Sequence, residues 1–368
     1  MQPHPPPWDN VVNLMVFMGN GVKILGSATV AQLTEFDEII DSRSPAEFAA
    51  DHIPGAINLP VLNDDERIRI GTLYKQVSAF EAKKLGAAMV SRNIACHLES
   101  YFLDKPRVYR PLVYCWRGGN RSGSLTHVLK KIGFAASQLD GGYKAYRSRV
   151  VEDLKSLPSQ FQFRVICGPT GSGKSRLLGA LNRAGAQVLD LEDLAAHRGS
   201  VLGVLPDHPQ PTQKAFESTL WSKLHALSPH QPVYVESESK RIGSLQIPDG
   251  LIAVMRASPC IRLHLPREAR IRLLVEEYQH FPQRPDVLID QLDQLSALRG
   301  RETIAGWRAL IDAEDWQGLV AALLDEHYDP AYRKSLAQNY ATTDQDKSLA
   351  LNDGGCGDFE QAARTLLV

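Results

Sequence analysis

The chain has 368 residues, of which 43% are hydrophobic and 23% are charged, and its formal net charge is −1. This length is sufficient for two domains with separate cores, and the composition is ordinary for a soluble globular protein. No apolar run reaches membrane-spanning length. A net charge near zero excludes nucleic-acid binding through overall charge, so any RNA-binding surface must be a local basic patch.

The N-terminus and the cysteines indicate a cytoplasmic protein. Residues 1–8 are proline-rich and lack the basic-then-apolar order of a secretory signal peptide, and we predict a flexible lead-in over 1–14. The five cysteines are scattered and form no C-x-x-C pair. This pattern disfavours a zinc site and fits free thiols in a reducing compartment.

Residues 15–155 are predicted to form a first α/β domain. Strands are expected at 38–41, 56–59 and 112–114, and helices at 44–51, 122–132 and 141–154, with 66–101 mostly helical. The strand at 112–114 delivers Cys115 to the carboxyl end of a strand, where α/β folds place their sites.

A second α/β domain is predicted over 161–340, after a polar linker at 155–160. Strands are expected at 161–167, 187–191, 232–235 and 261–265, with a helix at 174–184 and a helical end after residue 301. Alternation of strands and helices predicts a second parallel sheet. The stretch 342–357 is polar and contains glycine, so residues 341–368 are predicted to be a loose or helical tail.

A cysteine loop, Cys-Trp-Arg-Gly-Gly-Asn-Arg-Ser, occupies residues 115–122. Adjacent glycines let several backbone amides face one point ahead of a helix N-terminus, which stabilises an anion and lowers a thiol pKa. Arg117 and Arg121 can add charge-assisted hydrogen bonds. We therefore predict that Cys115, Arg117 and Arg121 are catalytic; the alternative is a small buried cysteine in a tight turn.

Protein phosphatases and rhodanese-type sulfurtransferases share such a loop. Residues 41–48, DSRSPAEF, and 51–58, DHIPGAIN, resemble the rhodanese signature, in which an Asp41–Arg43 pair and a turn at Pro54 would be scaffold. The loop arginine comes one residue later than in ordinary sulfurtransferases. This departure predicts a slightly wider pocket, suited to a bulkier adduct or acceptor.

A phosphate loop, Gly-Pro-Thr-Gly-Ser-Gly-Lys-Ser, occupies residues 168–175 between a predicted strand and a predicted helix. Its backbone amides would wrap a phosphate, Lys174 would bridge phosphate oxygens, and Ser175 would hold Mg²⁺. Glu236 follows a predicted strand and is either a second metal partner or a solvated strand end. The loop indicates a phosphate chain and does not distinguish ATP from a diphosphate ester. The predicted ligand-binding residues are Gly168, Thr170, Gly171, Ser172, Gly173, Lys174, Ser175 and Glu236.

Together with LEDLAAHRGS at 191–200 and ESESKRIG at 236–243, these strings resemble the tRNA 2-selenouridine synthase family over roughly residues 15–335. The resemblance implies a rhodanese-like domain fused to a P-loop NTPase-like domain. It also implies that wobble 2-thiouridine in tRNA is S-geranylated by geranyl diphosphate, after which selenium from selenophosphate displaces the S-geranyl group. Mg²⁺ is a candidate cofactor, a selenophosphate-producing enzyme is a candidate partner, and no membrane is involved.

The residues fit this scheme. Sulfur on C2 of uracil is a poor leaving group until it is alkylated, and the P-loop would stabilise charge on the departing diphosphate. Cys115 would carry selenium as a perselenide, or its amide nest would bind selenophosphate; both routes stay open at this stage.

Three basic residues near the predicted active face are candidates for tRNA contact: Arg198, Lys240 and Arg241. The alternative for the latter two is surface pairing with Glu236 and Glu238. At the level of function, the alternatives are a rhodanese-fused NTPase that passes sulfur to another acceptor, a C-x5-R phosphatase, and a nucleotide-gated RNA-binding module.

Overall fold

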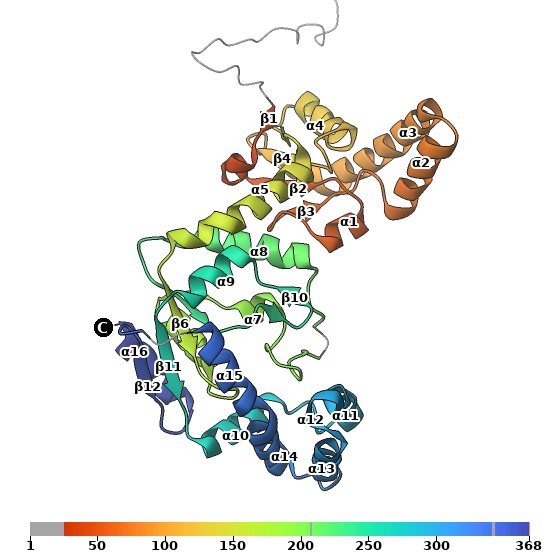
Figure 1. Ribbon diagram of the computed structural model, residues 1–368. Helices are drawn as coiled ribbons and strands as arrows, with labels where there is room; N and C mark the ends of the chain where they lie inside the picture. Colours follow the sequence, from red (N-terminus) through yellow and green to blue (C-terminus); the bar gives the residue numbers. More distant parts are fainter. Residues whose placement is uncertain (1–25, 207, 341–342, 368) are drawn as a thin grey trace, which may run out of the picture. The chain divides into compact units, whose positions relative to one another are not determined.

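The computed structural model describes residues 26–206, 208–340 and 343–367 (Figure 1). The predicted lead-in over 1–14 lies outside them. The chain divides into two compact units: the first holds residues up to 45 and 55–145, and the second holds 46–54 and everything from 146 onward. The boundary after residue 145 therefore falls inside a helix, before the predicted linker at 155–160. That linker continues the helix to Ser156 and then forms a short 3-10 helix in which Pro158 is buried.

The first part of the chain builds a five-stranded sheet in the order β1-β5-β4-β2-β3, with every neighbouring pair parallel. Strand β4 is buried along its whole length, as its apolar sequence predicts. The elements are β1 (Ser27–Ala28), the 3-10 helix η1 (Val30–Glu35), β2 (Glu38–Asp41), α1 (Pro45–Ala50), β3 (Ile57–Asn58), α2 (Asp64–Gln76), α3 (Ala79–His97), the π-helix η2 (Leu98–Phe102), β4 (Pro111–Tyr114), α4 (Asn120–Ile132), β5 (Ser137–Leu139), α5 (Gly142–Ser156) and the 3-10 helix η3 (Leu157–Gln160).

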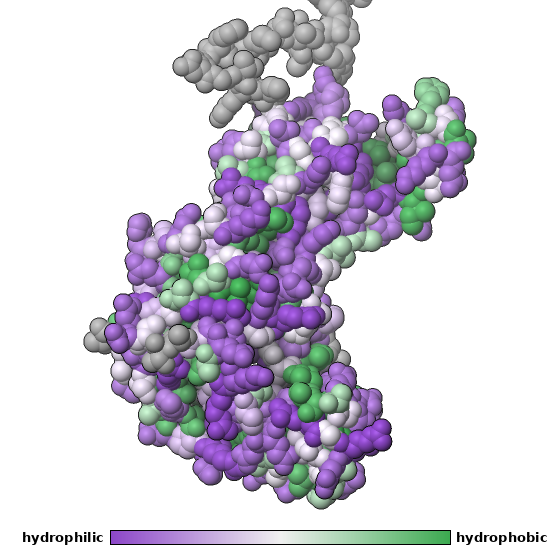
Figure 2. All heavy atoms as spheres, in the orientation of Figure 1, coloured by the Kyte–Doolittle hydropathy of each residue, from purple (hydrophilic) through white to green (hydrophobic). Residues whose placement is uncertain are grey.

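The predicted helical stretch at 66–101 is confirmed as the hairpin of α2 and α3. Asn63 caps α2 by accepting the Glu66 backbone N–H at 2.8 Å, and the Glu66 side chain accepts the Asn63 N–H in return. Ile68, Val77 and Phe80 are 62%, 72% and 66% exposed, and Figure 2 shows the hydrophobic patches of this hairpin. Helix formation here therefore depends on local capping more than on burial of apolar side chains.

The second unit builds another five-stranded parallel sheet, in the order β12-β11-β6-β8-β7, which confirms the predicted second parallel sheet. Its central strand leads directly into the phosphate loop. The elements up to its helical end are β6 (Phe163–Cys167), α6 (Lys174–Arg183), β7 (Gln187–Leu189), α7 (Leu191–Leu194), α8 (Gln213–Ala226), β8 (Val233–Glu236), the hairpin β9 (Arg241–Ile242) and β10 (Leu245–Gln246), α9 (Asp249–Arg256), β11 (Cys260–His264) and α10 (Arg267–Glu277).

The predicted helical end is also confirmed, and it has a core of its own (Figure 1). Trp307 is 1% exposed in this core, and its indole N–H donates to Glu326 Oε2 at 2.8 Å. Every helix among the described residues is too short or too polar to cross a bilayer. The helical end consists of α11 (Pro285–Asp293), α12 (Ser296–Arg299), α13 (Arg301–Asp312), α14 (Trp316–Leu323), the π-helix η4 (Leu324–Tyr328) and α15 (Asp329–Asn339).

The prediction of a loose stretch over 342–357 is wrong where β12 (Lys347–Ala350) lies. This strand pairs in parallel with β11, and Asp346 just before it accepts hydrogen bonds from the Cys260 backbone N–H at 2.9 Å and from Arg262 Nη2 at 2.8 Å. Its partners are more than 80 residues earlier in the chain, so local composition gives no sign of the strand.

The tail then forms α16 (Cys356–Leu367), which packs on α6. Phe359 is 2% exposed in the core beside Leu177 and Leu181, and its ring lies directly against Gly173 of the phosphate loop. The tail is therefore part of the structure that supports the loop.

Phe359→Ala is expected to destabilise the second unit by about 3–4 kcal/mol, because it removes a buried aromatic side chain and leaves a cavity. Thermal and urea unfolding of the purified chain measure this loss. Leu367→Ala is the matched control, since that side chain is on the same helix but 42% exposed. An unchanged unfolding midpoint for Phe359→Ala would show that α16 does not contribute to this core.

Candidate active site

The loop after β4 holds the Cys115 thiol within hydrogen-bond distance of two donors. The Gly119 backbone N–H donates to Cys115 Sγ at 3.3 Å, and Ser122 Oγ lies 3.1 Å from the same sulfur. Gly118 has φ of 64°, and a Cβ there would come within 2.7 Å of the Leu139 carbonyl oxygen, so this turn requires glycine. One backbone amide and one hydroxyl therefore point at the buried sulfur.

Gln138 on β5 holds this loop in place, although no motif in the sequence marks this residue. Its side-chain N–H₂ donates to the Gly118 carbonyl at 2.7 Å, to the Gly119 carbonyl at 3.1 Å and to Ser122 Oγ at 2.8 Å. A hydrogen-bonded chain therefore runs from Gln138 through Ser122 to the thiol. Only the pairing of β5 with β4 brings Gln138 to the loop.

The two predicted arginines differ in position. Arg117 is exposed, whereas Arg121 is half-buried in the first turn of α4. Arg121 lines a cavity of about 1150 Å³ between the loop and α3, together with Gly118 and Gly119. This cavity gives a bulky acceptor room beside the loop.

The predicted scaffold pair is confirmed. Arg43 Nη2 lies 2.6 Å from Asp41 Oδ2, and both side chains are at most 1% exposed. The Arg43 guanidinium also stacks over the Tyr143 ring at 3.9 Å from its centroid. The pair is sealed in the interior, which fits a structural role in holding the end of β2.

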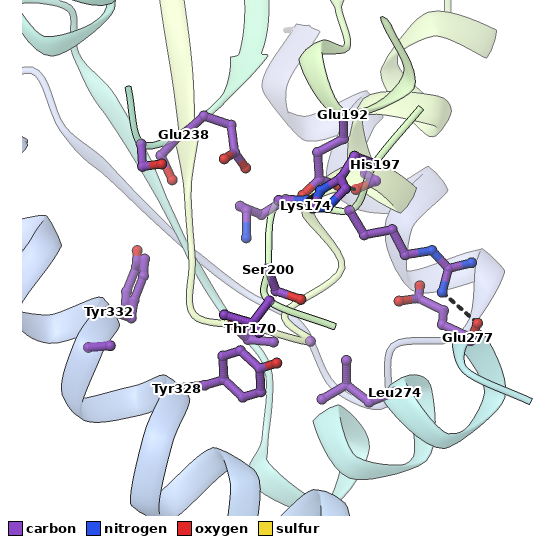
Figure 3. A pocket seen from close by; sticks show the side chains of 18 of the residues that line it. Thr170, Lys174, Glu192, His197, Ser200, Glu238, Leu274, Glu277, Tyr328 and Tyr332 are labelled. Carbon is purple, nitrogen blue, oxygen red and sulfur yellow. Dashed lines mark hydrogen bonds between the residues drawn. The ribbon is translucent and has the colours of Figure 1, made fainter. Parts of the chain in front are cut away.

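The phosphate loop connects β6 to α6, as its sequence predicts, and lines a cavity of about 600 Å³ (Figure 3). Lys174 Nζ donates to the Gly168 carbonyl at 3.1 Å. Arg270 of α10 donates to the Thr170 carbonyl through Nε at 3.0 Å and Nη2 at 2.8 Å, and it pairs with Asp329 at 2.6 Å. Arg270, which sequence reasoning missed, thus fixes the loop from a helix 100 residues away.

Three glutamates lie near the phosphate loop, but Glu236 does not line its cavity, which corrects the expectation for this residue. Its side chain is 0% exposed, and its Oε1 accepts the backbone N–H groups of Leu191 and Glu192 at 2.6 and 2.9 Å. Glu236 therefore anchors α7 and does not line the cavity. Glu192 and Glu238 line it, and Ser175 Oγ donates to Glu192 Oε2 at 3.0 Å.

Burial and mutual repulsion disfavour ionisation in this cluster. Burial, reinforced by Asp190, Glu192 and Glu238, raises the pKa of Glu236 well above its ordinary value. Burial and nearby Glu192 raise the pKa of Glu238 to about 8, against the opposing effect of Lys174. Such clustering of carboxyl groups around a phosphate-binding lysine is typical of a functional site.

The donor set fits Mg²⁺ bound together with phosphate. Ser175 and Glu192 supply oxygen donors next to the loop, whereas Glu236 is held by the α7 backbone and does not line the cavity. No group of three or more His, Cys, Asp or Glu side chains in the described ranges forms a complete metal site. A magnesium ion here would take most of its ligands from phosphate and water, as it commonly does.

The structure does not bring the three candidate RNA contacts together. Arg198 lines the cavity, where its Nη1 donates to the Glu277 carbonyl at 2.5 Å and its guanidinium lies 4.8 Å from the Tyr278 ring centroid. Lys240 and Arg241 are exposed and do not line that cavity. Lys240 pairs with Asp249 at 2.7 Å, and Glu236 and Glu238 are buried. The alternative of a surface pair between these basic residues and the two glutamates is therefore wrong.

Comparison with known proteins identifies two domains, one mostly in each of the two units described above. Residues 27–149 match the model of the rhodanese-like domain, and residues 161–287 match that of the tRNA 2-selenouridine synthase AAA domain. A tRNA 2-selenouridine synthase of Bdellovibrio bacteriovorus is 32% identical over 347 residues, covering 83% of this chain and 90% of that protein. The chain belongs to the tRNA 2-selenouridine synthase family.

Two further members of the tRNA 2-selenouridine synthase family agree over shorter spans. The protein of Nitrosomonas europaea is 38% identical over 244 residues, covering 65% of this chain and 63% of that protein. The protein of Nitrosomonas eutropha is 36% identical over 263 residues, covering 70% and 67%. The two domain matches include the cysteine loop, the phosphate loop, Glu192 and Glu238, and they end before most of the helical end and the tail.

Proposed function

We propose that this chain converts 2-thiouridine at the tRNA wobble position to 2-selenouridine through an S-geranylated intermediate, with geranyl diphosphate and selenophosphate as co-substrates. The observation that carries the proposal is the presence, in one member of this family, of two anion-binding loops with different chemistry. One surrounds the Cys115 thiol with amide and hydroxyl donors, and the other places Lys174 in a cavity large enough for a phosphate ester.

The first step is alkylation of the tRNA. The sulfur on C2 of 2-thiouridine attacks C1 of the geranyl group, the C1–O bond breaks, and its electron pair leaves on the diphosphate. The amides of residues 171–175 and the Lys174 ammonium are placed to stabilise that growing negative charge. Mg²⁺ bound at Ser175 and Glu192 would supply further charge neutralisation when present.

The second step replaces sulfur with selenium. Alkylated sulfur departs as a thiol that takes a proton from solvent, so a selenium nucleophile can add at C2 while the C2–S bond breaks. We assign delivery of selenium to the Cys115 loop, where bound selenophosphate would attack C2 through selenium and its P–Se bond would then break by transfer of the phosphoryl group to water. Gln138 and Ser122 hold the loop in place, and the cavity beside Arg121 leaves room for the modified base. A cytoplasmic location and a selenophosphate-producing enzyme as partner follow from these substrates.

Mass spectrometry of tRNA nucleosides from cells with and without this protein tests the proposal. Loss of 2-selenouridine on deletion, and its return on complementation, is the expected result. An unchanged nucleoside profile would overturn it. A missing sulfur modification with intact 2-selenouridine would favour a rhodanese-fused NTPase that transfers sulfur to another acceptor.

Changing both Lys240 and Arg241 to Ala is expected to weaken tRNA binding and flatten its salt dependence. Each phosphate contact contributes roughly 0.7–0.9 to the slope of log affinity against log salt, so the slope should fall by roughly 1.5. Filter binding or fluorescence anisotropy over a salt series measures it. Lys84 and Lys105, which are ion-paired in the first unit, provide a matched double alanine control. An unaltered slope would show that tRNA docks elsewhere.

A further inference from the structure

We propose that a second, apolar cavity beside the phosphate loop holds the distal part of the prenyl chain and selects its length. This inference rests on the proposed function, because it assigns a subsite to the geranyl diphosphate used there. The cavity measures about 70 Å³ and belongs entirely to the second unit. Its walls come from the phosphate loop, α10, the segment after α10, α11, α14 and η4.

The apolar cavity adjoins the diphosphate site. Both cavities share four lining residues: Thr170, Leu274, Tyr278 and Tyr328. The loop backbone also contacts α10 closely, since a Cβ on Gly171 would come within 2.7 Å of Leu274 Cδ1. A diphosphate in the loop therefore has an apolar wall immediately beside it.

Polar and apolar side chains line different parts of the two adjoining cavities. Figure 3 shows Lys174, Glu192 and Glu238 at one side of the larger cavity, and Thr170, Leu274 and Tyr328 at another. Beyond this shared wall, the lining is almost wholly hydrophobic: Leu202, Val275, Phe281, Pro282, Leu288, Trp316, Leu319, Val320, Leu323 and Leu324. A ligand that matches this order has a charged head and a hydrocarbon tail, which a nucleotide does not.

Two tyrosines stand at the junction between the cavities. The Tyr278 ring is held between an Arg198 guanidinium at 4.8 Å and the parallel Phe281 ring at 5.7 Å. With the diphosphate in the loop, the allylic carbons next to it would lie near Tyr278 and Tyr328. Positive charge that develops there as the C1–O bond breaks would be stabilised by the Tyr328 ring.

The length of prenyl chain that the site accepts is then set by residues that line only the apolar cavity. Val320 and Trp316 of α14 line it and do not line the larger cavity, and both are half-buried, so a change in volume alters the space for the distal isoprene unit first. A hydrophobic pocket discriminates a single methylene by about 10- to 200-fold. Donors that differ by a whole isoprene unit should therefore differ measurably in kcat/KM.

The experiment compares prenyl transfer from dimethylallyl, geranyl and farnesyl diphosphates to a 2-thiouridine-containing tRNA, with S-prenyl nucleosides quantified by mass spectrometry. Val320→Phe narrows the cavity and is expected to lower kcat/KM for geranyl relative to dimethylallyl diphosphate by about 10-fold or more. Trp316→Ala widens it and is expected to raise kcat/KM for farnesyl relative to geranyl diphosphate by a similar factor.

Leu310→Phe is the matched control, because Leu310 belongs to the same helical core but lines neither cavity. Inhibition by inorganic diphosphate should be unchanged in all three variants, which confirms an intact loop. If neither α14 variant changes the kcat/KM ratios between donors, the inference is overturned, although prenyl transfer by the wild type would still support the proposed function. A wild-type chain that forms no S-prenyl nucleoside from any donor would instead overturn the proposed function.

Discussion

Cys115→Ser is expected to abolish selenium incorporation while leaving geranylation largely intact, so that S-geranyl-2-thiouridine accumulates on the tRNA. A serine hydroxyl can accept the hydrogen bonds from Gly119 and Ser122 but provides no thiolate nucleophile. The loss should be at least about 1000-fold, since no other group in the nest replaces the sulfur nucleophile. Mass spectrometry of tRNA nucleosides after reaction with both co-substrates measures both products.

Cys96→Ser is the control for this variant, because Cys96 is an exposed thiol on α3. It should leave the yield of 2-selenouridine unchanged. A normal yield from Cys115→Ser would show that selenium transfer does not need the thiolate and would favour selenophosphate acting without it. Loss of both products would point to a structural role for the cysteine.

Lys174→Ala is expected to slow geranylation by roughly 10- to 100-fold, because it removes a charge-assisted contact to the departing diphosphate that is worth about 1.5–3 kcal/mol. The lysine's hydrogen bond to the Gly168 carbonyl is the contact that a bound phosphate would replace. Single-turnover formation of S-geranyl-2-thiouridine measures the rate. If pre-geranylated tRNA is supplied, selenation should be partly restored.

Lys155→Ala provides the control, since Lys155 is exposed on α5 and pairs only with exposed Glu152 among the described residues. Its rates should match those of the wild type. Equal loss of both steps in Lys174→Ala would contradict a role confined to diphosphate binding and indicate that the lysine orders the tRNA or the loop.

The sequence by itself determined the two loops and the elements that carry them. Each loop is a contiguous string between a strand and a helix, and its function depends on backbone amides and glycines that lie next to one another in the chain. The same local character made the helical stretch that forms α2 and α3 and the apolar strands β4 and β6 predictable. Four strings in a fixed order were sufficient to indicate the family.

Only the tertiary structure decided what surrounds these loops. Gln138 reaches the Cys115 loop through strand pairing, and Arg270 reaches the Thr170 carbonyl from α10. Phe359 packs on Gly173 from a tail that the sequence predicted only as loose or helical. These hydrogen bonds and packing contacts join residues distant in sequence, so they do not appear in any local sequence pattern.

The acidic residues illustrate the same limit. Glu236 and Glu238 are two positions apart, yet Glu236 accepts hydrogen bonds from the backbone amides of α7, while Glu238 lines the cavity. The prenyl subsite is likewise formed by helices that follow one another in the chain with no motif among them. Its existence depends on how α10, α11 and α14 pack against the loop, because a cavity is a property of packed side chains and not of any one segment.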